Sequence, residues 1–448
     1  MSWMADFVGR ALGSPSGGPP EFSEVSTDTR TLKAGAIFVA LVGERFDGHD
    51  HLARARDAGA RAAIVRSGTP ALEGLELIPV DDTLLAYGML ARARRRMITG
   101  PVIAITGSNG KTSTKEMTAA VLATRYRTHA TRLNLNNLVG IPQTILAAPH
   151  STEAMVIEAG ANTPGEISRA REIIEPTIGI ITNVGESHLE GFGSTEGVLR
   201  EKLALVEGVS LAIVGSEPAA LATEARRRAR RLVTAGLANA DVIPERFALD
   251  ASGQPAFSID GVNVHLPLRG AHQAGNAMLA WALVRELGLD REAAAAALSH
   301  LVLPGGRGDL LQSGRFTILH DAYNANPSSF RSAIATAQAM RAGRRLVFVA
   351  GSMRELGSDS PRLHREIAGE LVALEPELLA VVGDFVAALS PFRDQLGDRL
   401  ITADDPLTLG PLLAGRLEGD ELIVLKASRG VALERILPYL GVKSDSAH

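Results

Sequence analysis

The sequence contains no cysteine, which excludes disulfide bonds, thiolate metal sites and cysteine nucleophiles. No apolar run reaches the roughly 18 residues that a membrane-spanning helix needs, and residues 1–20 lack the apolar core of a signal peptide. The formal net charge of −4 argues against a general nucleic-acid binder, and we interpret the basic cluster at 226–231 as a solvated helix face. These absences predict a cytoplasmic protein with no membrane span and no nucleic-acid partner.

The chain has 448 residues, which allows about three domains at roughly 150 residues each. We place these domains at residues 1–98, 99–311 and 312–448. In the first domain, short apolar segments at 34–41 and 62–66 predict strands, and the segment 50–60 between them predicts a helix. A loop is predicted at 13–20, and a further helix at 84–97 should end before Gly100 and Pro101.

Beyond residue 101, apolar and helical segments alternate. Near-continuous apolar runs predict buried strands at 102–106, 154–160, 178–185 and 211–216, and then at 316–323, 345–353, 378–384 and 421–428. Strands without a polar face are covered on both sides, which indicates parallel sheets with helices on each face. The glycine-rich segment Pro304 to Gly308 separates the two series and is predicted to be a hinge.

The first of these strands runs directly into the loop "TGSNGKT", residues 106–112. A strand that ends in glycines before a helix directs backbone N–H groups and the positive end of the helix dipole at one point. Gly107 and Gly110 let phosphate oxygens approach the backbone, Lys111 supplies a positive charge, and the Thr112 hydroxyl can hold Mg²⁺. The usual pattern has its first glycine at position 105, where this chain has isoleucine, so the loop is a shortened variant. The alternative is a glycine turn before an ordinary helix.

Polar residues follow the next two predicted strands. Glu158 ends the strand "AMVIE", and His188 follows the strand that begins at 178. Ligands sit at the carboxyl ends of strands in open α/β sheets, and a carboxylate and an imidazole beside a phosphate loop suit Mg²⁺. The alternatives are a helix N-cap for Glu158 and an ordinary loop residue for His188. Likewise, Asn134, Asn136 and Asn137 either form a turn or contact phosphate or a metal-bound water.

Together these motifs resemble those of the Mur ligase family, ATP-dependent enzymes that form amide bonds in peptidoglycan synthesis. The resemblance spans nearly the whole chain. It is carried by Glu158 and by the segments "TGSNGKT", "NLNNLVGIP" (134–142), "NVGESHLEGFG" (183–193), "GAHQAGNAMLA" (270–280), "PGGR" (304–307) and "DAYNANP" (321–327). One departure from the family pattern is Ala427, where these ligases usually have glycine.

The resemblance implies an α/β fold of three domains. These are a small N-terminal α/β domain that binds a UDP-sugar, a central P-loop-type parallel-sheet domain that binds ATP, and a C-terminal Rossmann-like ligase domain. It also implies a monomer that uses ATP and Mg²⁺ to join D-alanyl-D-alanine to UDP-N-acetylmuramoyl-tripeptide through an acyl phosphate. The segments 26–51, 321–327 and 351–357 are those that favour these two substrates.

The resemblance further assigns roles to individual residues. The implied ATP contacts are Gly107, Ser108, Asn109, Gly110, Lys111, Thr112, Ser113, Asn276 at adenine, Asp321 at ribose and Arg307 at the γ-phosphate. The implied metal ligands are Thr112, Glu158, His188 and Lys202, and Lys202 is expected to be carbamylated. The implied substrate contacts are Ser26, Thr27, Asp47, Asn137, Tyr323, Asn324 and Asn326, and the implied catalytic residues are Lys111, His188, Lys202 and Arg307.

Three other functions remain open on the sequence. A folylpolyglutamate-type or other Mur-type ligase would use a different acceptor, although folate ligases lack a separate first domain such as residues 1–98. A P-loop phosphotransferase or NTPase switch would need neither Lys202 nor a third domain. A non-catalytic nucleotide-binding module would not need Lys111, Glu158 and His188 together.

Overall fold

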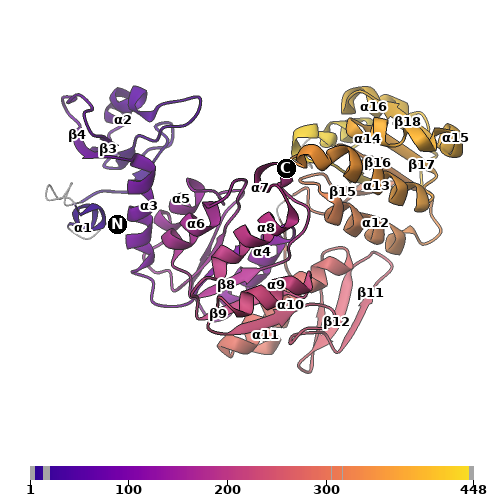
Figure 1. Ribbon diagram of the computed structural model, residues 1–448, viewed down its shortest axis with the longest axis horizontal. Helices are drawn as coiled ribbons and strands as arrows, with labels where there is room; N and C mark the ends of the chain where they lie inside the picture. Colours follow the sequence, from indigo (N-terminus) through magenta and orange to yellow (C-terminus); the bar gives the residue numbers. More distant parts are fainter. Residues whose placement is uncertain (1–5, 14–20, 304, 315, 443–448) are drawn as a thin grey trace.

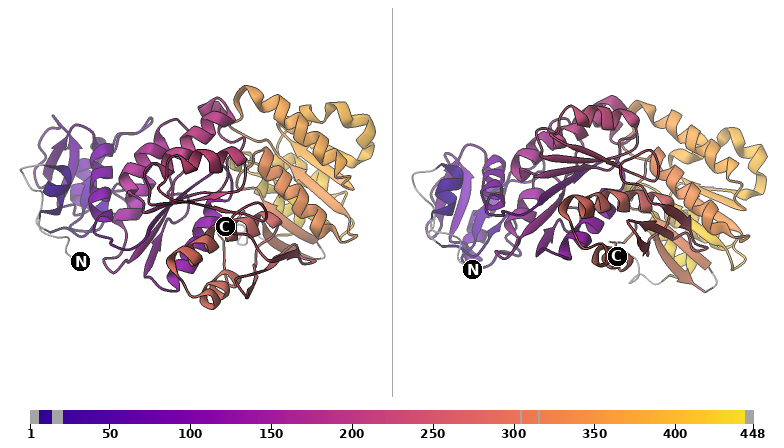
Figure 2. Two further views of the ribbon diagram at one scale, coloured as in Figure 1. Left: turned by 60° about the horizontal axis from the view of Figure 1, so that its bottom comes forward. Right: turned by 90° about the horizontal axis from the view of Figure 1, so that it is seen from below.

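The computed structural model describes residues 6–13, 21–303, 305–314 and 316–442. These residues form three α/β units that follow one another along the molecule, with the N-terminal unit at one end and the C-terminal unit at the other (Figures 1 and 2). The predicted α/β class with three domains is confirmed. Pro304 of the predicted hinge and residues 14–20 of the predicted loop lie outside the described residues.

The N-terminal unit is a parallel sheet with strand order β1-β2-β3-β4. Its elements are α1 (Phe7–Leu12), β1 (Val25–Ser26), β2 (Ile37–Val39), η1 (Gly48–His51), α2 (Leu52–Asp57), β3 (Ala62–Arg66), β4 (Glu76–Val80) and α3 (Thr83–Arg95). The strand predicted at 34–41 is therefore only three residues long. Helix α3 begins where the Asp82 carboxylate accepts hydrogen bonds from the Leu84 and Leu85 N–H groups.

The central unit is a parallel sheet with strand order β10-β9-β8-β5-β7-β6. Its elements are β5 (Val102–Thr106), α4 (Lys111–Ala123), β6 (Thr128–Ala130), α5 (Gly140–Leu146), β7 (Ala154–Glu158), α6 (Glu166–Ile174), β8 (Ile178–Ile181), α7 (Leu189–Phe192), α8 (Thr195–Leu203), η2 (Ala204–Val206), β9 (Leu211–Gly215), α9 (Ala219–Arg226) and β10 (Leu232–Ala235). Alternate residues of β5 enter different cores: Ile103 and Ile105 lie with α4, and Val102 and Ala104 with α3 and α5. Both faces of the sheet are therefore covered, as the apolar runs predict.

An antiparallel sheet and two helices follow the central sheet, and the sequence analysis did not predict this sheet. The elements are β11 (Arg246–Leu249), β12 (Pro255–Ile259), β13 (Val262–His265), α10 (Ala271–Leu287) and α11 (Arg291–Ser299). Residues of β12 and β13 alternate between buried and less buried positions. Helix α10 is buried over most of its length and packs against α4.

The C-terminal unit has the strand order β14-β15-β19-β16-β17-β18, in which only β14 is antiparallel to its neighbour within the described residues. Its elements are β14 (Asp309–Ser313), β15 (Phe316–Asp321), α12 (Pro327–Arg341), β16 (Leu346–Ala350), η3 (Gly357–Asp359), α13 (Ser360–Ala373), β17 (Leu378–Val382), α14 (Asp384–Ala388), η4 (Ser390–Phe392), α15 (Arg393–Leu396), η5 (Gly397–Arg399), β18 (Leu400–Ala403), α16 (Pro406–Ala414), β19 (Leu422–Lys426), η6 (Arg429–Val431) and η7 (Leu433–Leu440). The domain boundary placed after residue 311 falls inside β14.

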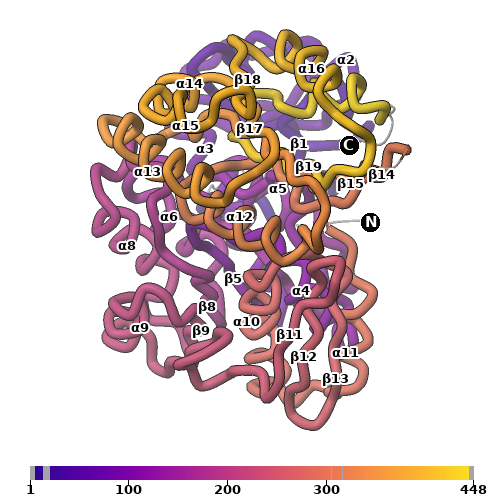
Figure 3. The backbone as a smooth tube through the Cα atoms, turned by 90° about the vertical axis from the view of Figure 1, so that its right-hand side faces the viewer, coloured from indigo at the N-terminus to yellow at the C-terminus, as the bar shows by residue number. Residues whose placement is uncertain are grey.

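The three units are joined in different ways. Helix α3 packs against α5 and α6, so that the N-terminal sheet and one face of the central sheet share a single apolar core (Figure 1). Helix α12 of the C-terminal unit lies along the border with the central unit and contacts α10 (Figure 3). Among the described helices, none is both long and apolar enough to cross a bilayer.

The buried Arg94 side chain on α3 fixes this helix to the central unit, because its guanidinium donates hydrogen bonds to the carbonyl oxygens of Ala148 and Pro149 at 3.1 and 2.8 Å. Replacing Arg94 by alanine leaves these carbonyls without that donor, and an unsatisfied buried polar group costs about 1–3 kcal/mol. We therefore expect Arg94→Ala to lower the free energy of unfolding by about 2 kcal/mol in urea titrations followed by circular dichroism. The matched control is Arg92→Ala on the same helix, whose exposed ion pair with Glu175 should contribute less than about 1 kcal/mol. Equal effects of the two substitutions would contradict this assignment.

Candidate active site

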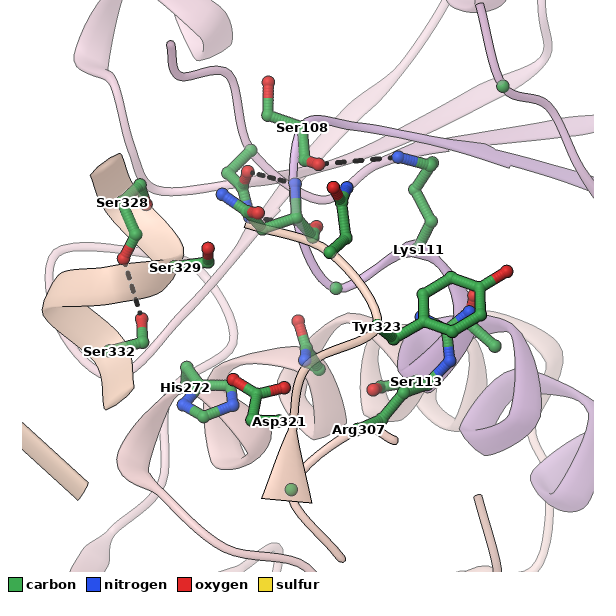
Figure 4. Close-up of a pocket in the computed structure, with 18 of the residues that line it drawn as sticks. Ser108, Lys111, Ser113, His272, Arg307, Asp321, Tyr323, Ser328, Ser329 and Ser332 are labelled. Carbon is green, nitrogen blue, oxygen red and sulfur yellow. Dashed lines mark hydrogen bonds between the residues drawn. The ribbon is translucent and has the colours of Figure 1, made fainter. Parts of the chain in front are cut away.

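A cavity of about 460 Å³ lies between the central and C-terminal units. This volume is within the range of ligand sites, about 300–1,000 Å³. Its walls come from the phosphate loop, from the ends of β7 and β15, and from α10 and α12 (Figure 4). Ser108, Lys111 and Ser113 of the central unit line the cavity together with Arg307, Asp321 and Tyr323 (Figure 4).

The loop after β5 has the geometry of a phosphate cradle. Gly107 and Gly110 have φ angles of 151° and 76°, which favour glycine, and a Cβ atom on either would overlap Thr182 or Asn276. Helix α4 starts at Lys111 directly after Gly110, so its N-terminal N–H groups point into the cavity region. The segment after β8 holds the loop in place, because the Asn183 Oδ1 atom accepts a hydrogen bond from the Asn109 N–H at 3.0 Å.

The Lys111 ammonium group is folded onto its own loop. Its Nζ atom donates to the carbonyl oxygens of Gly107 at 2.8 Å and Ser108 at 3.4 Å. Burial lowers the pKa of Lys111, and the negative charge of Glu158 opposes that shift. An anion in the cradle would provide a charged acceptor in place of neutral carbonyls, so the side chain is suited to a phosphate group.

Thr112 and Glu158 form a pair at the start of α4. The Thr112 hydroxyl donates to Glu158 Oε2 at 2.9 Å, and the Asn136 amide donates to Glu158 Oε1 at 2.9 Å. A hydroxyl and a buried carboxylate in contact suit Mg²⁺, which accepts one or two protein oxygens and completes its shell with phosphate and water. No group of three or more histidine or acidic side chains placed to hold a metal occurs in the described part of the chain. The residues therefore fit a cation that arrives with a nucleotide.

His188 and Lys202, the other two predicted metal ligands, both belong to the central unit. His188 Nδ1 lies 2.5 Å from the Oε2 atom of Glu355, and the contact with His188 lowers the pKa of Glu355. Lys202 is fully buried, and its Nζ atom has no hydrogen-bond partner among the described residues. Burial, followed by the nearby charge of Lys111, lowers the pKa of Lys202 to about 7. His188 lines the cavity and Lys202 does not.

Two further residues that the resemblance assigned to ATP also line the cavity: Asp321 at the end of β15, and Arg307 in the segment before β14. The Lys426 ammonium group contacts Asp321 Oδ2 at 2.7 Å, because β15 and β19 pair with these two residues opposite each other. The Arg307 guanidinium carbon lies 3.9 Å from the centre of the Tyr323 ring, and Figure 4 shows these two side chains together. The Arg429 guanidinium carbon lies 5.1 Å from the same ring centre. Positive groups thus surround the cavity from both units.

Other predicted residues have local contacts of their own. Asn276 is buried beside Gly110, and Asn137 lines the cavity while its Oδ1 accepts from the Gly140 N–H at the start of α5. Asn324 lines the cavity as well, whereas Asn326 begins α12 and donates to Asn109 Oδ1 at 2.8 Å across the two units. The binding roles of these residues remain predictions.

The residues predicted to contact the sugar nucleotide belong to the N-terminal unit and are not among the described residues that line this cavity. Ser26 and Thr27 lie at the end of β1, and Ser26 forms hydrogen bonds with Asp28. Asp47 begins η1 and accepts from the His49 N–H at 2.9 Å. The structure therefore does not bring these residues together with the phosphate loop, and their role remains a prediction.

The sequence analysis gave no role to several residues that shape the site. Lys426 ends a predicted apolar strand, and a lysine at the carboxyl end of a buried parallel strand was a usable signal. Thr182 and Asn183 follow β8 directly and could have been found in the same way. Glu355 is in an irregular segment before η3; it lies within the segment 351–357 that carries part of the resemblance, but no role was predicted for this residue.

Comparison with known proteins agrees with this geometry. The model of the Mur ligase family catalytic domain matches residues 21–95, that of the Mur ligase middle domain 105–284, and that of the Mur ligase, glutamate ligase domain 306–429. The chain therefore belongs to the Mur ligase family, which confirms the resemblance. It is 35% identical to the UDP-N-acetylmuramoyl-tripeptide–D-alanyl-D-alanine ligase of Bacillus subtilis, over 98% of this chain and 97% of that protein.

Two solved structures are also similar. The crystal structure of MurF from Acinetobacter baumannii has a TM-score of 0.89 and 29% sequence identity, and covers 98% of this chain and 99% of its own. MurF ligase from Thermotoga maritima, solved in complex with ADP, has a TM-score of 0.81 and 27% identity, and covers 93% of this chain and 96% of its own.

The left-handed backbone at Gly110 provides a test of the phosphate cradle. We expect Gly110→Ala to weaken binding of a non-hydrolysable ATP analogue about 10- to 100-fold, because backbone strain costs about 1–3 kcal/mol and the new methyl group overlaps Asn276. Isothermal titration calorimetry measures this change. The control is Gly275→Ala in α10, where an added Cβ atom meets no neighbour within 4 Å. Unchanged affinity in Gly110→Ala would show that nucleotide does not bind at this loop.

Proposed function

We propose that this chain is an ATP-dependent ligase that joins D-alanyl-D-alanine to the free carboxylate of UDP-N-acetylmuramoyl-tripeptide and releases ADP and phosphate. One observation carries the proposal: the phosphate loop with its Thr112–Glu158 pair shares a single cavity with Asp321 and Lys426 of the C-terminal unit and with Arg307, which lies just before β14. The names of the full-length relatives support this pair of substrates and do not favour a ligase with a different acceptor.

The chemistry explains why so many positive groups are needed. A carboxylate is a poor electrophile, so its oxygen first attacks the γ-phosphorus of ATP, and ADP leaves as an acyl phosphate forms. Both reactants are anions, and the protein must screen their charges and align them. Mg²⁺, when held by Thr112 and Glu158, adds positive charge at the phosphates. Lys111 and Arg307 supply fixed charge, and removal of one such group typically costs about 10²–10³ in rate.

In the second half of the reaction, the neutral D-alanyl-D-alanine amine attacks the acyl carbon and the C–N bond forms. The C–O bond to phosphate then breaks, the nitrogen loses one proton, and phosphate leaves with that proton as hydrogen phosphate. Water would hydrolyse the acyl phosphate, so the site must be closed while this intermediate exists. The C-terminal unit provides one wall of the cavity, and the contact between Asn109 and Asn326 joins the two units beside the phosphate loop. Docking of this unit therefore serves both to complete the ATP site and to exclude water.

The N-terminal unit, residues 1–98, is proposed to hold the uridine end of the sugar nucleotide, with Ser26, Thr27 and Asp47 as candidate contacts. Residues 99–311 would then bind ATP, and residues 312–448 would complete the ligase site. A cytoplasmic location and a monomeric state remain predictions.

Lys202 is proposed to be carbamylated. A lysine amine reacts with CO₂ only when it is neutral: the nitrogen lone pair forms the N–C bond and one proton is released. A pKa of about 7 keeps a large fraction of Lys202 neutral at physiological pH. The buried Nζ atom, with no hydrogen-bond partner among the described residues, supports this modification, and the resulting anion would be a metal ligand.

Lys111→Ala tests the central claim. We expect the variant to keep its affinity for UDP-N-acetylmuramoyl-tripeptide within about twofold, since the sugar nucleotide is held mainly elsewhere, and to lose about 10²–10³ in kcat. A coupled assay that follows phosphate release in the presence of both substrates measures the rate. Arg227→Ala removes an exposed ion pair with Glu224 and serves as the control. Turnover in Lys111→Ala at the wild-type rate would remove the phosphate loop from the mechanism.

Lys202→Ala tests the carbamate. We expect ligation to be nearly lost and partly restored by added acetate or formate, which can replace the missing carboxylate. In the unmodified protein, the carbamate signal obtained with ¹³C-labelled CO₂ by NMR should decrease as the pH falls below about 7, because the amine becomes protonated. Lys33→Ala, which changes an exposed lysine, should keep the signal. Full activity of Lys202→Ala without any added carboxylate would exclude the carbamate.

A further inference from the structure

A contact between the two halves of the site involves the histidine that is a candidate metal ligand. His188 belongs to the central unit and Glu355 to the C-terminal unit, and His188 Nδ1 lies 2.5 Å from Glu355 Oε2. The sequence separates these residues by more than 160 positions, so the contact exists only when the two units are docked.

The contact determines which edge of the imidazole faces the cavity. His188 Nδ1 is buried against the Glu355 carboxylate, although the angles between the two groups are not those of a hydrogen bond, while 18% of the His188 side chain remains exposed and His188 lines the cavity. The accessible part of the ring is therefore the edge opposite Nδ1, which carries Nε2. The Phe192 ring lies edge-on to the imidazole, with 6.5 Å between centroids, and also lies 5.8 Å from Lys202 Nζ. Glu355 and Phe192 thus both contact the imidazole.

The backbone segments that carry His188 and Glu355 are both held by neighbouring interactions. His188 has a left-handed φ angle of 52° and begins α7, and Glu355 has a φ angle of 64°. The neighbouring Leu189 and Leu356 are buried in one apolar cluster, and the Glu190 N–H donates to the Glu355 carbonyl oxygen at 3.2 Å.

The segment before Glu355 is held within its own unit. The Met353 N–H donates to Nε2 of the buried His364 at 2.9 Å, and the Arg354 N–H donates to Ser428 Oγ at 2.9 Å. The carboxylate is therefore presented by a fixed loop rather than by a free surface chain.

We propose that Glu355 is a positioning residue: it accepts the Nδ1 proton of His188 and so directs the Nε2 lone pair into the cavity for a divalent cation. A histidine that binds a metal commonly donates its other N–H to a carboxylate, which fixes the tautomer and the ring orientation. Because Glu355 comes from the C-terminal unit, docking of that unit would complete the metal ligand as well as the ATP site. The inference rests on the proposed metal-dependent ligation.

If Glu355 does not position His188, its carboxylate has the opposite effect on metal binding. If the Glu355 carboxylate occupied the position of the cation, the carboxylate would compete with the cation, and removal of the carboxylate would strengthen metal binding. The two roles therefore predict changes of opposite sign, which a binding measurement separates without reference to activity.

The test measures Mn²⁺ binding to the full-length protein saturated with a non-hydrolysable ATP analogue, using the electron paramagnetic resonance signal of free Mn²⁺. Mn²⁺ held by the analogue alone is subtracted. We expect Glu355→Ala to weaken Mn²⁺ binding about 10- to 100-fold, the usual effect of losing such a carboxylate. Glu355→Gln keeps a hydrogen-bond acceptor but removes the negative charge, and it should weaken Mn²⁺ binding less than Glu355→Ala does. The control is Glu418→Gln, an exposed carboxylate of the same unit that pairs with Arg345.

A double-substitution cycle separates positioning from general destabilisation. In a His188→Ala background, Glu355→Ala should cause no further loss of Mn²⁺ affinity, because its effect passes through the imidazole. Small-angle scattering of each variant reports whether the units remain docked.

Two results would overturn the inference: Mn²⁺ affinity unchanged in Glu355→Ala, or Mn²⁺ affinity increased. The failure of the proposed function would look different, because phosphate release by the unmodified protein would then not depend on both substrates, whatever the Mn²⁺ titrations give.

Discussion

The position of the site depends on the fixed end of strand β5. This strand is paired on both sides, with β7 and β8, and is buried on both faces, so its carboxyl end has almost no freedom to move. Three functional features meet there: the glycine loop follows β5 itself, Glu158 ends β7, and Thr182 and Asn183 follow β8. The proposed phosphate cradle, the proposed pair of cation ligands and the residues that support the loop thus come from three adjacent strand ends of one sheet.

Much of this arrangement could be predicted from the sequence, since it depends on short-range patterns. The strand predicted at 102–106 is β5, with the same bounds, and Glu158 and His188 lie at the predicted edge. The run at 178–185 extends beyond β8, because Thr182 and Asn183 leave the sheet to contact the phosphate loop. The antiparallel strands β11 to β13 were missed because they are short and half exposed, which gives no long apolar run.

The remaining features depend on contacts that no local pattern encodes. Asp321 and Lys426 meet only because β15 and β19 are neighbours in the sheet, although more than 100 residues separate them. Glu355 meets His188, and Asn326 meets Asn109, only through docking of two separate units. In the sequence, each of these residues is a polar side chain in a loop or at the end of a strand, and its partner is identified only in the three-dimensional structure.

The shared core beneath α3 has a consequence for the length of the acceptor. The N-terminal and central sheets are joined by buried side chains, including Tyr87 and Leu90, and by the guanidinium of Arg94, so these two units pack around one shared core as a continuous body. If uridine is held in the N-terminal part of that body, as the proposed function has it, the shared core sets the distance from the uridine to the phosphate loop. A peptide stem that is too short would then leave its carboxylate out of reach of the γ-phosphate, and one that is too long would have to fold back on itself.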